Sequence, residues 1–396
     1  MVSTQTLQNP TSRQESRQET RTVICRRPLP RSVKIASVVG ARPQFIKAAP
    51  VSREVRQHNE EILVHTGQHH DDNMSEVFFE VLDIPRPDYN LGIGGGSPAW
   101  QTAEMIRALD GVLEKERPEF VLVYGDTNST LAGAIVASKR GLPLGHVEAG
   151  LRSYNRAMPE EINRIVADQL SVLLFCPTQT AVDNLEREGI ERGVHMVGDV
   201  MYDIALQSAQ AARSRDVAAR FGVTRGEYVL ATLHRPGNVD DRAVLTGIVR
   251  AFARSRRPIV FPVHPRTRKN LEAFGLWDTL RARVKAIDPV DYLDFIALVM
   301  GAWKVVTDSG GVQKEAYFFG VPCVTLRDST EWTETLELDA NALAGTDPER
   351  IARAAREMSE AQRSWKQPFG DGHAAEKIVR VTADVVSAVA AVAAAG

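Results

Sequence analysis

The sequence of 396 residues has few cysteines and no long hydrophobic run. Cys25, Cys176 and Cys323 are too few and too far apart for a zinc site or a disulfide framework. They favour a reducing compartment, by default the cytoplasm, with buried or inert thiols. The longest apolar runs, such as residues 172–176, fall far short of the roughly 18 residues that a membrane-spanning helix needs, so we expect no membrane partner.

An excess of basic residues is also missing. The chain has 48 Lys and Arg against 50 Asp and Glu, which gives a formal net charge of -2. A surface that follows nucleic-acid phosphates normally shows a basic excess, so we expect no nucleic-acid partner. The length and the hydrophobic content of 43% predict two or three domains with full cores.

Residues 1–31 contain no apolar core that could serve as a signal peptide. They are rich in Gln, Thr, Ser and Arg, a composition that predicts a disordered extension. An organelle transit peptide, against which Glu15 and Glu19 argue, and a nucleic-acid-binding arm are the alternatives.

From Val33 onward, short apolar stretches alternate with helix-compatible segments, as in the βα units of a parallel sheet. The pattern starts again after Gly198, so we expect two doubly wound α/β domains, residues 32–197 and 198–372, and a C-terminal helix within residues 373–396. The expected strands are residues 33–39, 62–65, 120–124, 142–147, 172–176, 194–197, 228–233, 259–263 and 305–306, with a short one after Pro322.

Polar residues follow the expected strands of the first half. Arg42 and Lys47 lie after the first strand, where ligands bind in open α/β sheets, although solvated cations would fit these positions equally well. Asp126, Glu148 and Glu160 lie at or just beyond the ends of later strands. Asp126 alone would be read as a helix cap, but three acids at one edge suggest an acid/base cluster.

The second half offers groups that could bind an anion. His234 and His264 each follow an expected strand, a place where a single histidine is more often structural. Ser309, Gly310 and Gly311 lie between a strand and a helix, where free N–H groups can hold a diphosphate, and Glu315 could hold a sugar hydroxyl. An ordinary capped helix start is the alternative. Together the two halves predict a cleft with acids on one wall and anion-binding groups on the other.

Two motifs invite a cofactor interpretation that their details do not support. Neighbouring side chains such as His69, His70 and Asp71 diverge in an extended loop, so a shared metal ion is not expected. The glycine-rich residues 91–97 have Ser97 at the third glycine position of a dinucleotide fingerprint and follow no buried strand. We expect neither a metal nor NAD.

Nine motifs occur in the order and spacing of the UDP-N-acetylglucosamine 2-epimerase family, which the chain resembles over about residues 33–380. A single motif would be weak evidence, but nine in order make chance agreement negligible. The motifs are G-A-R-P-Q-F-I-K, H-T-G-Q-H, Y-G-D-T-N-S-T-L-A, H-V-E-A-G-L-R, P-E-E-I-N-R, H-R, P-V-H-P-R-T-R, T-D-S-G-G-V-Q-K-E-A and G-D-G.

The resemblance implies a glycosyltransferase-B-like fold of two Rossmann-like domains, a UDP-sugar in the cleft between them, a C-terminal helix that crosses back to the first domain, and a homodimer. It also implies a non-hydrolysing epimerase of cell-surface polysaccharide biosynthesis that interconverts UDP-GlcNAc and UDP-ManNAc without a cofactor. Family positions tied to catalysis match Asp126, Glu148, Glu160 and His234. Positions that contact the substrate match Arg42, Lys47, Asp126, Glu148, His234, Phe295, Ser309, Gly310, Gly311 and Glu315.

The chain departs from the family pattern at two places, and there the family's functional residues are not assigned to this chain. Members regulated by a second substrate molecule have H-R-R-E where this chain has H-R-P-G, which argues against allosteric activation. Many members have T-E-R-P-E where this chain has T-E-W-T-E, so Trp332 is not carried over as a nucleotide contact.

The amino-acid sequences of several motifs resemble more closely the branch that includes UDP-2,3-diacetamido-2,3-dideoxyglucuronate 2-epimerases. UDP-2,3-diacetamido-2,3-dideoxyglucuronate is therefore an alternative substrate. Two alternative activities are a hydrolysing epimerase that releases ManNAc and UDP, and a glycosyltransferase of the same fold. The motifs concerned are H-T-G-Q-H-H-D-D-N-M-S, L-G-I-G-G-G-S and T-E-W-T-E.

Overall fold

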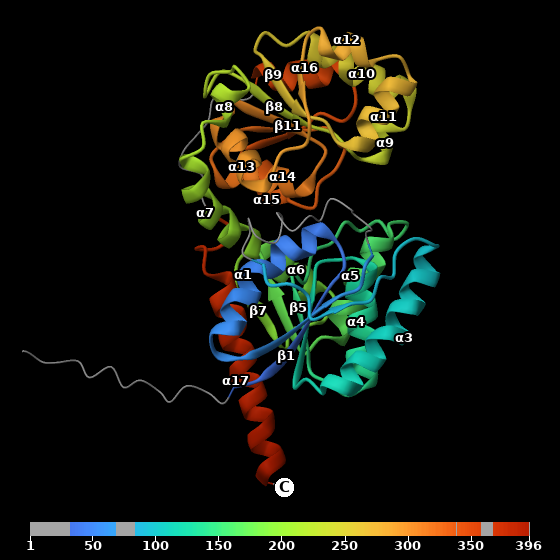
Figure 1. Ribbon diagram of the computed structural model, residues 1–396. Helices are drawn as coiled ribbons and strands as arrows, with labels where there is room; N and C mark the ends of the chain where they lie inside the picture. Colours follow the sequence, from blue (N-terminus) through green and yellow to red (C-terminus); the bar gives the residue numbers. More distant parts are fainter. Residues whose placement is uncertain (1–31, 69–83, 338, 358–366, 396) are drawn as a thin grey trace, which may run out of the picture. The chain divides into compact units, whose positions relative to one another are not determined.

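The computed structural model describes residues 32–68, 84–337, 339–357 and 367–395. These residues form two parallel β-sheets with helices on both faces of each (Figure 1). The prediction of an α/β fold with two doubly wound sheets is confirmed. The extension predicted for residues 1–31 and the loop from His69 to Asp71 lie outside the described residues.

The first sheet is seven-stranded, and every pairing in it is parallel. In spatial order its strands are β3 (Tyr89–Asn90), β2 (Glu60–His65), β1 (Lys34–Val39), β4 (Phe120–Tyr124), β5 (Leu144–Val147), β6 (Leu173–Cys176) and β7 (Val194–Met196). The predicted strands of this half are confirmed to within about two residues, the usual uncertainty of such boundaries. The sequence does not reveal β3, because this short edge strand is only partly buried and carries no apolar run.

The second sheet is six-stranded and also entirely parallel. In spatial order its strands are β10 (Lys285–Ile287), β9 (Ile259–Pro262), β8 (Val229–Thr232), β11 (Lys304–Thr307), β12 (Cys323–Thr325) and β13 (Asn341–Leu343). The predicted strands are again confirmed, whereas the edge strands β10 and β13, with three residues each, are too short to stand out in the sequence.

Helices follow most of the strands. In the first half they are α1 (Arg42–His58), α3 (Pro98–Glu116), α4 (Asn128–Lys139), α5 (Pro159–Leu170) and α6 (Gln179–Arg187). Those that come later in the chain are α7 (Val200–Arg213), α8 (Val217–Arg220), α9 (Pro236–Val239), α10 (Arg242–Ala253), α11 (Pro265–Ala273), α12 (Trp277–Arg281), α13 (Tyr292–Gly301), α14 (Gly310–Phe318), α15 (Thr333–Glu337), α16 (Pro348–Glu357) and α17 (Ala374–Ala395).

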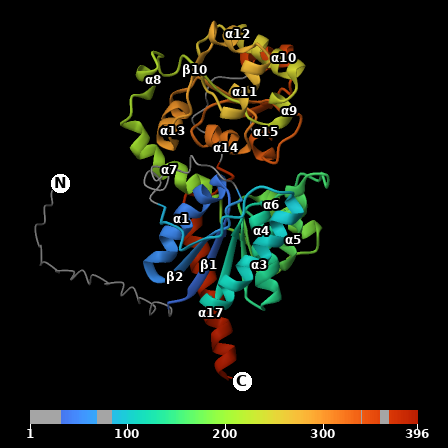
Figure 2. The same cartoon turned by 45° about the vertical axis from the view of Figure 1, so that its right-hand side comes forward.

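Alternate residues of the central strands pack on opposite faces of each sheet. In β1, Ala36 and Val38 belong to a core cluster with side chains of α3, α4 and α5, while Ile35 belongs to the cluster that contains α1. Figure 2 shows α3, α4 and α5 on one face of this sheet and α1 on the other. In β8, Ala231 packs with α10 and α16, and Leu230 with α13 and α14. Burial on both faces explains why the strands are continuous apolar runs.

Two long helices connect the halves of the chain. α7 contacts α1 of the first half and α13 of the second, and α17 returns to pack against α1 and α7. α17 spans Ala374–Ala395, within residues 373–396, where a C-terminal helix is expected from the sequence. The predicted domain boundary at Gly198 stays a prediction.

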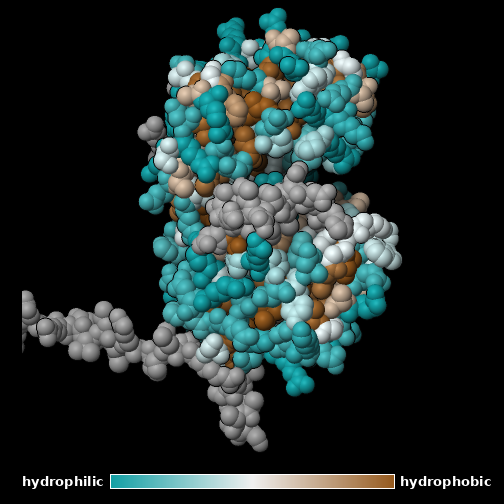
Figure 3. All heavy atoms as spheres, in the orientation of Figure 1, coloured by the Kyte–Doolittle hydropathy of each residue, from teal (hydrophilic) through white to brown (hydrophobic). Residues whose placement is uncertain are grey.

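The face drawn in Figure 3 carries mainly hydrophilic side chains, with smaller apolar areas between them. Across the described ranges of the chain, no helix combines the length and the apolar character that crossing a bilayer would require.

Asp203 on α7 holds the first turn of α17. Its Oδ2 accepts a hydrogen bond from the backbone N of Ala375 at 2.8 Å. Burial raises the pKa of this carboxyl to about 6, and the nearby Asp199 adds to the rise, while backbone hydrogen bonds oppose it. The folded protein therefore binds this proton more tightly than the unfolded chain does.

It follows that the contribution of Asp203 to stability is largest below about pH 4 and is lost as the pH rises through about 6. Asp203→Asn keeps an acceptor for the Ala375 N–H. We expect the free energy of unfolding of this variant, relative to that of wild type, to rise by on the order of 2 kcal/mol between about pH 4 and pH 6. Melting temperatures measured as a function of pH test this, with the exposed change Asp384→Asn on α17 as the matched control. A difference in Tm that stays constant with pH would contradict it.

Candidate active site

The switch points of the two sheets carry the polar residues predicted from the sequence. The strand order reverses between β1 and β4 in the first sheet and between β8 and β11 in the second. Ligands of open α/β sheets bind outside the carboxyl ends of such strands. Arg42 and Asp126 follow β1 and β4, and His234 and Ser309 follow β8 and β11.

Glu148 is the most constrained acid of the first half. Its φ of 72° lies in the left-handed region that residues other than glycine rarely adopt. Its Oε2 pairs with Nζ of Lys47 from α1, and its Oε1 accepts from Nζ of Lys314 at 3.2 Å. Burial of Glu148 opposes ionisation, but the two lysines outweigh it and lower the pKa of this carboxyl to about 2. Glu148 is therefore a carboxylate that can accept a proton.

Gly125 leaves room for the Lys47–Glu148 pair. The residue has a φ of 60°, and a Cβ atom at this position would lie 2.9 Å from Lys47 Nζ and 3.3 Å from Glu148 Oε2. Both the positive φ and the closeness of the Lys47 ammonium favour glycine at this position. The same turn brings Asp126, the next residue, to the edge of the sheet where Glu148 lies.

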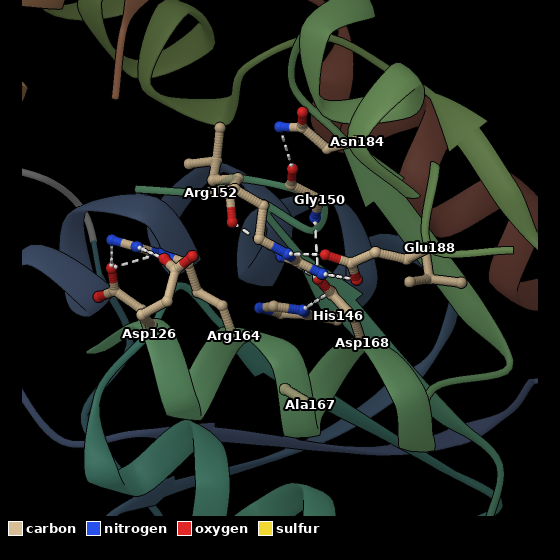
Figure 4. A network of polar contacts seen from close by, with 12 residues as sticks. Asp126, His146, Gly150, Arg152, Arg164, Ala167, Asp168, Asn184 and Glu188 are labelled. Carbon is tan, nitrogen blue, oxygen red and sulfur yellow. Dashed lines mark hydrogen bonds and ion pairs between the residues drawn. The ribbon is translucent and has the colours of Figure 1, made fainter. Parts of the chain in front are cut away.

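Asp126 is held by α5. Its Oδ2 accepts from Nη2 of the buried Arg164 at 2.6 Å (Figure 4). Its backbone O accepts from the side-chain amide of Asn163 at 2.9 Å. The alternative of Asp126 as a helix cap is wrong, because Thr127 is the N-cap of α4. Arg164 fixes the orientation of the Asp126 carboxylate.

Glu160 is the exposed member of an adjacent pair of acids at the start of α5. The buried Glu161 accepts hydrogen bonds from the backbone N of Ser153 and from Arg164, and therefore organises the loop. Burial and Arg327 lower the pKa of the Arg235 guanidinium, and the charge of Glu160 acts against this shift. Glu160 thus lies close enough to influence a cation of the second half electrostatically.

His146 and Arg152 belong to a buried network that supports this edge. His146 Nδ1 lies 2.6 Å from Asp168 Oδ1, and its Nε2 lies 2.7 Å from the backbone O of Gly125. Arg152 donates to Asp168 at 2.7 Å and to Glu188 at 2.7 Å (Figure 4). The network braces the turn that precedes Asp126, and these two basic residues are structural.

Asp308 orients His234 in the second half. β8 and β11 are parallel neighbours, so the residues after them meet. Asp308 accepts from the backbone N of His234 at 3.0 Å and of Arg235 at 2.9 Å, and its Oδ1 lies 3.1 Å from His234 Nδ1. Burial would raise the pKa of Asp308, but these contacts, led by that of His234, lower it. The other ring nitrogen of His234 is available to a ligand.

His264 lies beside His234, with 5.8 Å between the ring centroids. It is the exposed N-cap of α11, and its Nδ1 accepts from the backbone N of Arg266 at 3.2 Å. The structure therefore brings the two predicted histidines together and gives His264 a capping contact.

The turn from Ser309 to Gly311 opens α14, with Ser309 as the N-cap. A Cβ atom at Gly310 would lie 2.4 Å from Glu331 Oε1, whereas one at Gly311 would lie 3.9 Å from Ser309 Oγ, an ordinary contact. Burial opposes ionisation of Glu331, and charges led by Arg327 lower its pKa below the usual value. Neighbouring arginines therefore hold Glu331 as a carboxylate beside the start of α14.

The remaining predicted contacts differ in their exposure. Glu315 is buried on α14, and burial raises its pKa to about 7 against the effects of Tyr292 and Lys314. Phe295 on α13 is half-buried against the core. Arg42 is exposed at the first residue of α1.

Sequence reasoning did not select three charged residues that the structure brings to these positions: Lys314, Asp308 and Arg164. Lys314 is buried and donates to Asp199 Oδ2 at 2.5 Å as well as to Glu148. Only their place beside predicted site residues could have pointed to two of them, since Asp308 directly precedes Ser309 and Lys314 directly precedes Glu315. A pattern of this kind does not reveal a partner far away in the chain.

Metal-binding and thiol groups add nothing to this arrangement. Within the part of the chain that the structure describes, no cluster of three or more His, Cys, Asp and Glu residues could hold a metal ion. Cys176 and Cys323 are buried free thiols, and burial raises the pKa of both. Cys25 lies outside the described residues.

Comparison with known proteins identifies relatives that this chain matches over nearly all of their length. A UDP-N-acetylglucosamine 2-epimerase homolog of Methanococcus maripaludis is 50% identical over 353 residues, 88% of this chain and 99% of the relative. The UDP-2,3-diacetamido-2,3-dideoxy-D-glucuronate 2-epimerase of Pseudomonas aeruginosa is 50% identical over 361 residues, 89% of this chain and 99% of the relative.

Solved structures agree with these relatives. The Methanocaldococcus jannaschii UDP-GlcNAc 2-epimerase in complex with UDP-GlcNAc and UDP matches with a TM-score of 0.81 and 44% identity, over 88% of this chain and 99% of that one. A calicheamicin glycosyltransferase shares the fold alone, with a TM-score of 0.51 at 13% identity over 90% of this chain and 95% of that one. The predicted glycosyltransferase-B-like fold is thus confirmed. Since a family model described as UDP-N-acetylglucosamine 2-epimerase also matches residues 53–383, the chain belongs to the UDP-N-acetylglucosamine 2-epimerase family.

Proposed function

We propose that this protein is a non-hydrolysing 2-epimerase that interconverts UDP-GlcNAc and UDP-ManNAc. One observation carries the proposal: the carboxylate of Glu148 at the edge of the first sheet is joined through Lys314 to α14, whose N-terminal turn suits a diphosphate. A proton acceptor and a leaving-group site are thereby linked in one chain. Relatives at 44 to 50% identity that carry this enzyme name support the assignment.

Departure of UDP is the first step of the proposed reaction. The C2 proton of a 2-acetamido sugar is not acidified by an adjacent carbonyl, so direct abstraction is difficult. Breaking the C1–O bond, with the electron pair leaving on UDP, gives an oxocarbenium-like centre that acidifies C2. The turn at Ser309 to Gly311, with Arg42 and His234, would stabilise the developing diphosphate charge.

Proton transfer at C2 follows. A carboxylate takes the C2 proton as the C1=C2 double bond of 2-acetamidoglucal forms, and protonation from the opposite face with return of UDP to C1 completes the epimerisation. Glu148, Asp126 and Glu160 are the candidates for the two faces. Glu148 is ionised and buried, Asp126 is oriented by Arg164, and Glu160 is exposed. The fixed position of the Glu148 carboxylate, rather than its basicity, favours Glu148 as the first base.

The uronate is the second candidate substrate. The Pseudomonas aeruginosa relative is named for UDP-2,3-diacetamido-2,3-dideoxy-D-glucuronate and is as similar in sequence as the Methanococcus maripaludis homolog. The same elimination and re-addition would apply, because the reacting C1 and C2 atoms carry the same groups. Hydrolysis to ManNAc and UDP would follow if water took the place of UDP at C1, and glycosyl transfer would follow if an acceptor hydroxyl did.

Assembly and location are part of the same proposal. We infer a homodimer that acts in the cytoplasm and supplies a UDP-sugar for cell-surface polysaccharide, as the family resemblance implies. Sedimentation of the purified protein measures the first point, since the chain mass is 43.6 kDa and a monomer would sediment accordingly.

The function is tested in deuterated water. We expect incubation with UDP-GlcNAc to place deuterium at C2 of intact UDP-GlcNAc and UDP-ManNAc, because the abstracted proton exchanges before re-addition. NMR of the sugar ring measures this, with UDP-2,3-diacetamido-2,3-dideoxyglucuronate in a parallel sample. Free UDP with ManNAc would instead indicate the hydrolase, and unchanged spectra of both UDP-sugars would refute the epimerase.

Removing the proposed base separates chemistry from binding. We expect Glu148→Gln to reduce C2 exchange by at least about 100-fold, because a general base is lost, while UDP still binds. Exchange is followed by NMR and UDP binding by calorimetry. The exposed change Glu114→Gln on α3 is the matched control. Near-normal exchange in Glu148→Gln would remove Glu148 from the mechanism.

The diphosphate site is tested at Gly311. A methyl group there meets only an ordinary contact in the ligand-free fold, and alanine favours a helix by about 0.5–1 kcal/mol over glycine. We therefore expect Gly311→Ala to keep or raise Tm but to weaken UDP binding by roughly 10-fold or more, since the methyl blocks close approach of the phosphates to the backbone. Unchanged affinity with unchanged Tm would show that UDP does not approach this turn.

A further inference from the structure

The buried Lys314 lies between the two sets of groups described above. It is among the largest fully buried side chains of the described residues. Its Nζ donates to Asp199 Oδ2 at 2.5 Å and to Glu148 Oε1 at 3.2 Å, and lies 3.9 Å from the ring centroid of Trp332. The side chain is thus fixed on three sides, which is unusual for a flexible lysine.

The contacts of Lys314 join three elements. Lys314 is on α14, three residues after Gly311 at the start of that helix. Glu148 follows β5 of the first sheet. Asp199 is the N-cap of α7 and accepts from the backbone N of Met201 at 2.8 Å. Any shift of α14 relative to the first sheet must therefore move or break a contact of Glu148.

Charged groups from α1, α14 and α7 contact Glu148 or its partner Lys314. Lys47 from α1 faces its Oε2, Lys314 from α14 faces its Oε1, and Asp199 from α7 faces Lys314. Two lysines and two acids balance. Burial opposes the charge of Lys314, but Asp199 and Glu148 outweigh it and raise the pKa of Lys314 above its ordinary value. The ammonium therefore stays charged, and a charged neighbour favours the ionised form of Glu148.

We propose that Lys314 is a positioning residue for proton transfer at C2: it holds the Glu148 carboxylate in register with the leaving-group helix α14. The inference rests on the proposed epimerase function for its kinetic consequence. Its electrostatic consequence can be measured without any turnover.

Lys314→Met tests both consequences, because methionine fills similar space without the charge. In this variant Lys47 is the one remaining cationic partner of Glu148 among the contacts described above. The titration midpoint of the Glu148 carboxyl should therefore rise by about one pH unit or more. This is measured by ¹³C NMR of protein labelled at the glutamate carboxyl carbon, with Glu148→Gln identifying the resonance. An unchanged midpoint would overturn the proposal even if the wild-type protein proves not to be an epimerase.

The kinetic arm uses C2 exchange as a function of pH. We expect Lys314→Met to lower kcat about 100-fold with little change in UDP affinity, and to move the acid limb of the profile to higher pH. Lys314→Arg, which keeps the charge, should restore the acid limb and much of the rate. The exposed change Lys139→Met on α4 is the control. An equal, pH-independent loss in the Met and Arg variants would mark a merely structural role and overturn the proposal.

A milder variant covers the case in which Lys314→Met does not fold. Asp199→Asn keeps a good N-cap for α7 but removes one partner of Lys314. We expect a lower kcat with nearly unchanged UDP affinity, because Lys314 is less firmly held against Glu148. Wild-type kcat and pH profile in this variant would overturn the proposal. Absence of exchange in the wild-type protein would instead refute the epimerase function, and the NMR titration would then decide the role of Lys314.

Discussion

Two lysines, the half-buried Lys47 and the buried Lys314, each place an ammonium against one oxygen of Glu148, and the arrangement of the site depends on these contacts. A buried charge without partners would cost several kcal/mol, so Lys47, Glu148, Lys314 and Asp199 stabilise the fold only as a set. The set ties α1, the loop after β5, the start of α7 and α14 together. It also explains why Glu148 can keep a left-handed backbone conformation, because contacts on both carboxylate oxygens compensate for the strain.

Charged partners also orient the other candidate groups. Asp126 is fixed by Arg164, and His234 by Asp308, which in addition accepts from the backbone of Arg235. Supporting contacts of this kind reduce the freedom of a group before substrate arrives, which is how an active site avoids reorganisation during the reaction. The neighbouring His146 network braces the turn before Asp126 from within the core.

Much of the fold follows from the sequence, because strands buried on both faces must be continuous apolar runs. The same logic places residues after such strands at one edge, so the positions of Asp126, Glu148 and His234 could be predicted. Partners distant in sequence could not: Lys314 and Glu148 are 166 residues apart, and no local pattern marks them as neighbours. The edge strands β3, β10 and β13 escaped prediction because two or three residues are too few to form a recognisable apolar run.

Trp332 gives the charge set an optical reporter. The indole is buried, and the ammonium of Lys314 lies 3.9 Å from its ring centroid. Because the excited indole has a larger dipole than its ground state, a fixed cation at this distance shifts its emission. A change in the emission of Trp332 would therefore accompany any departure of Lys314 from its place.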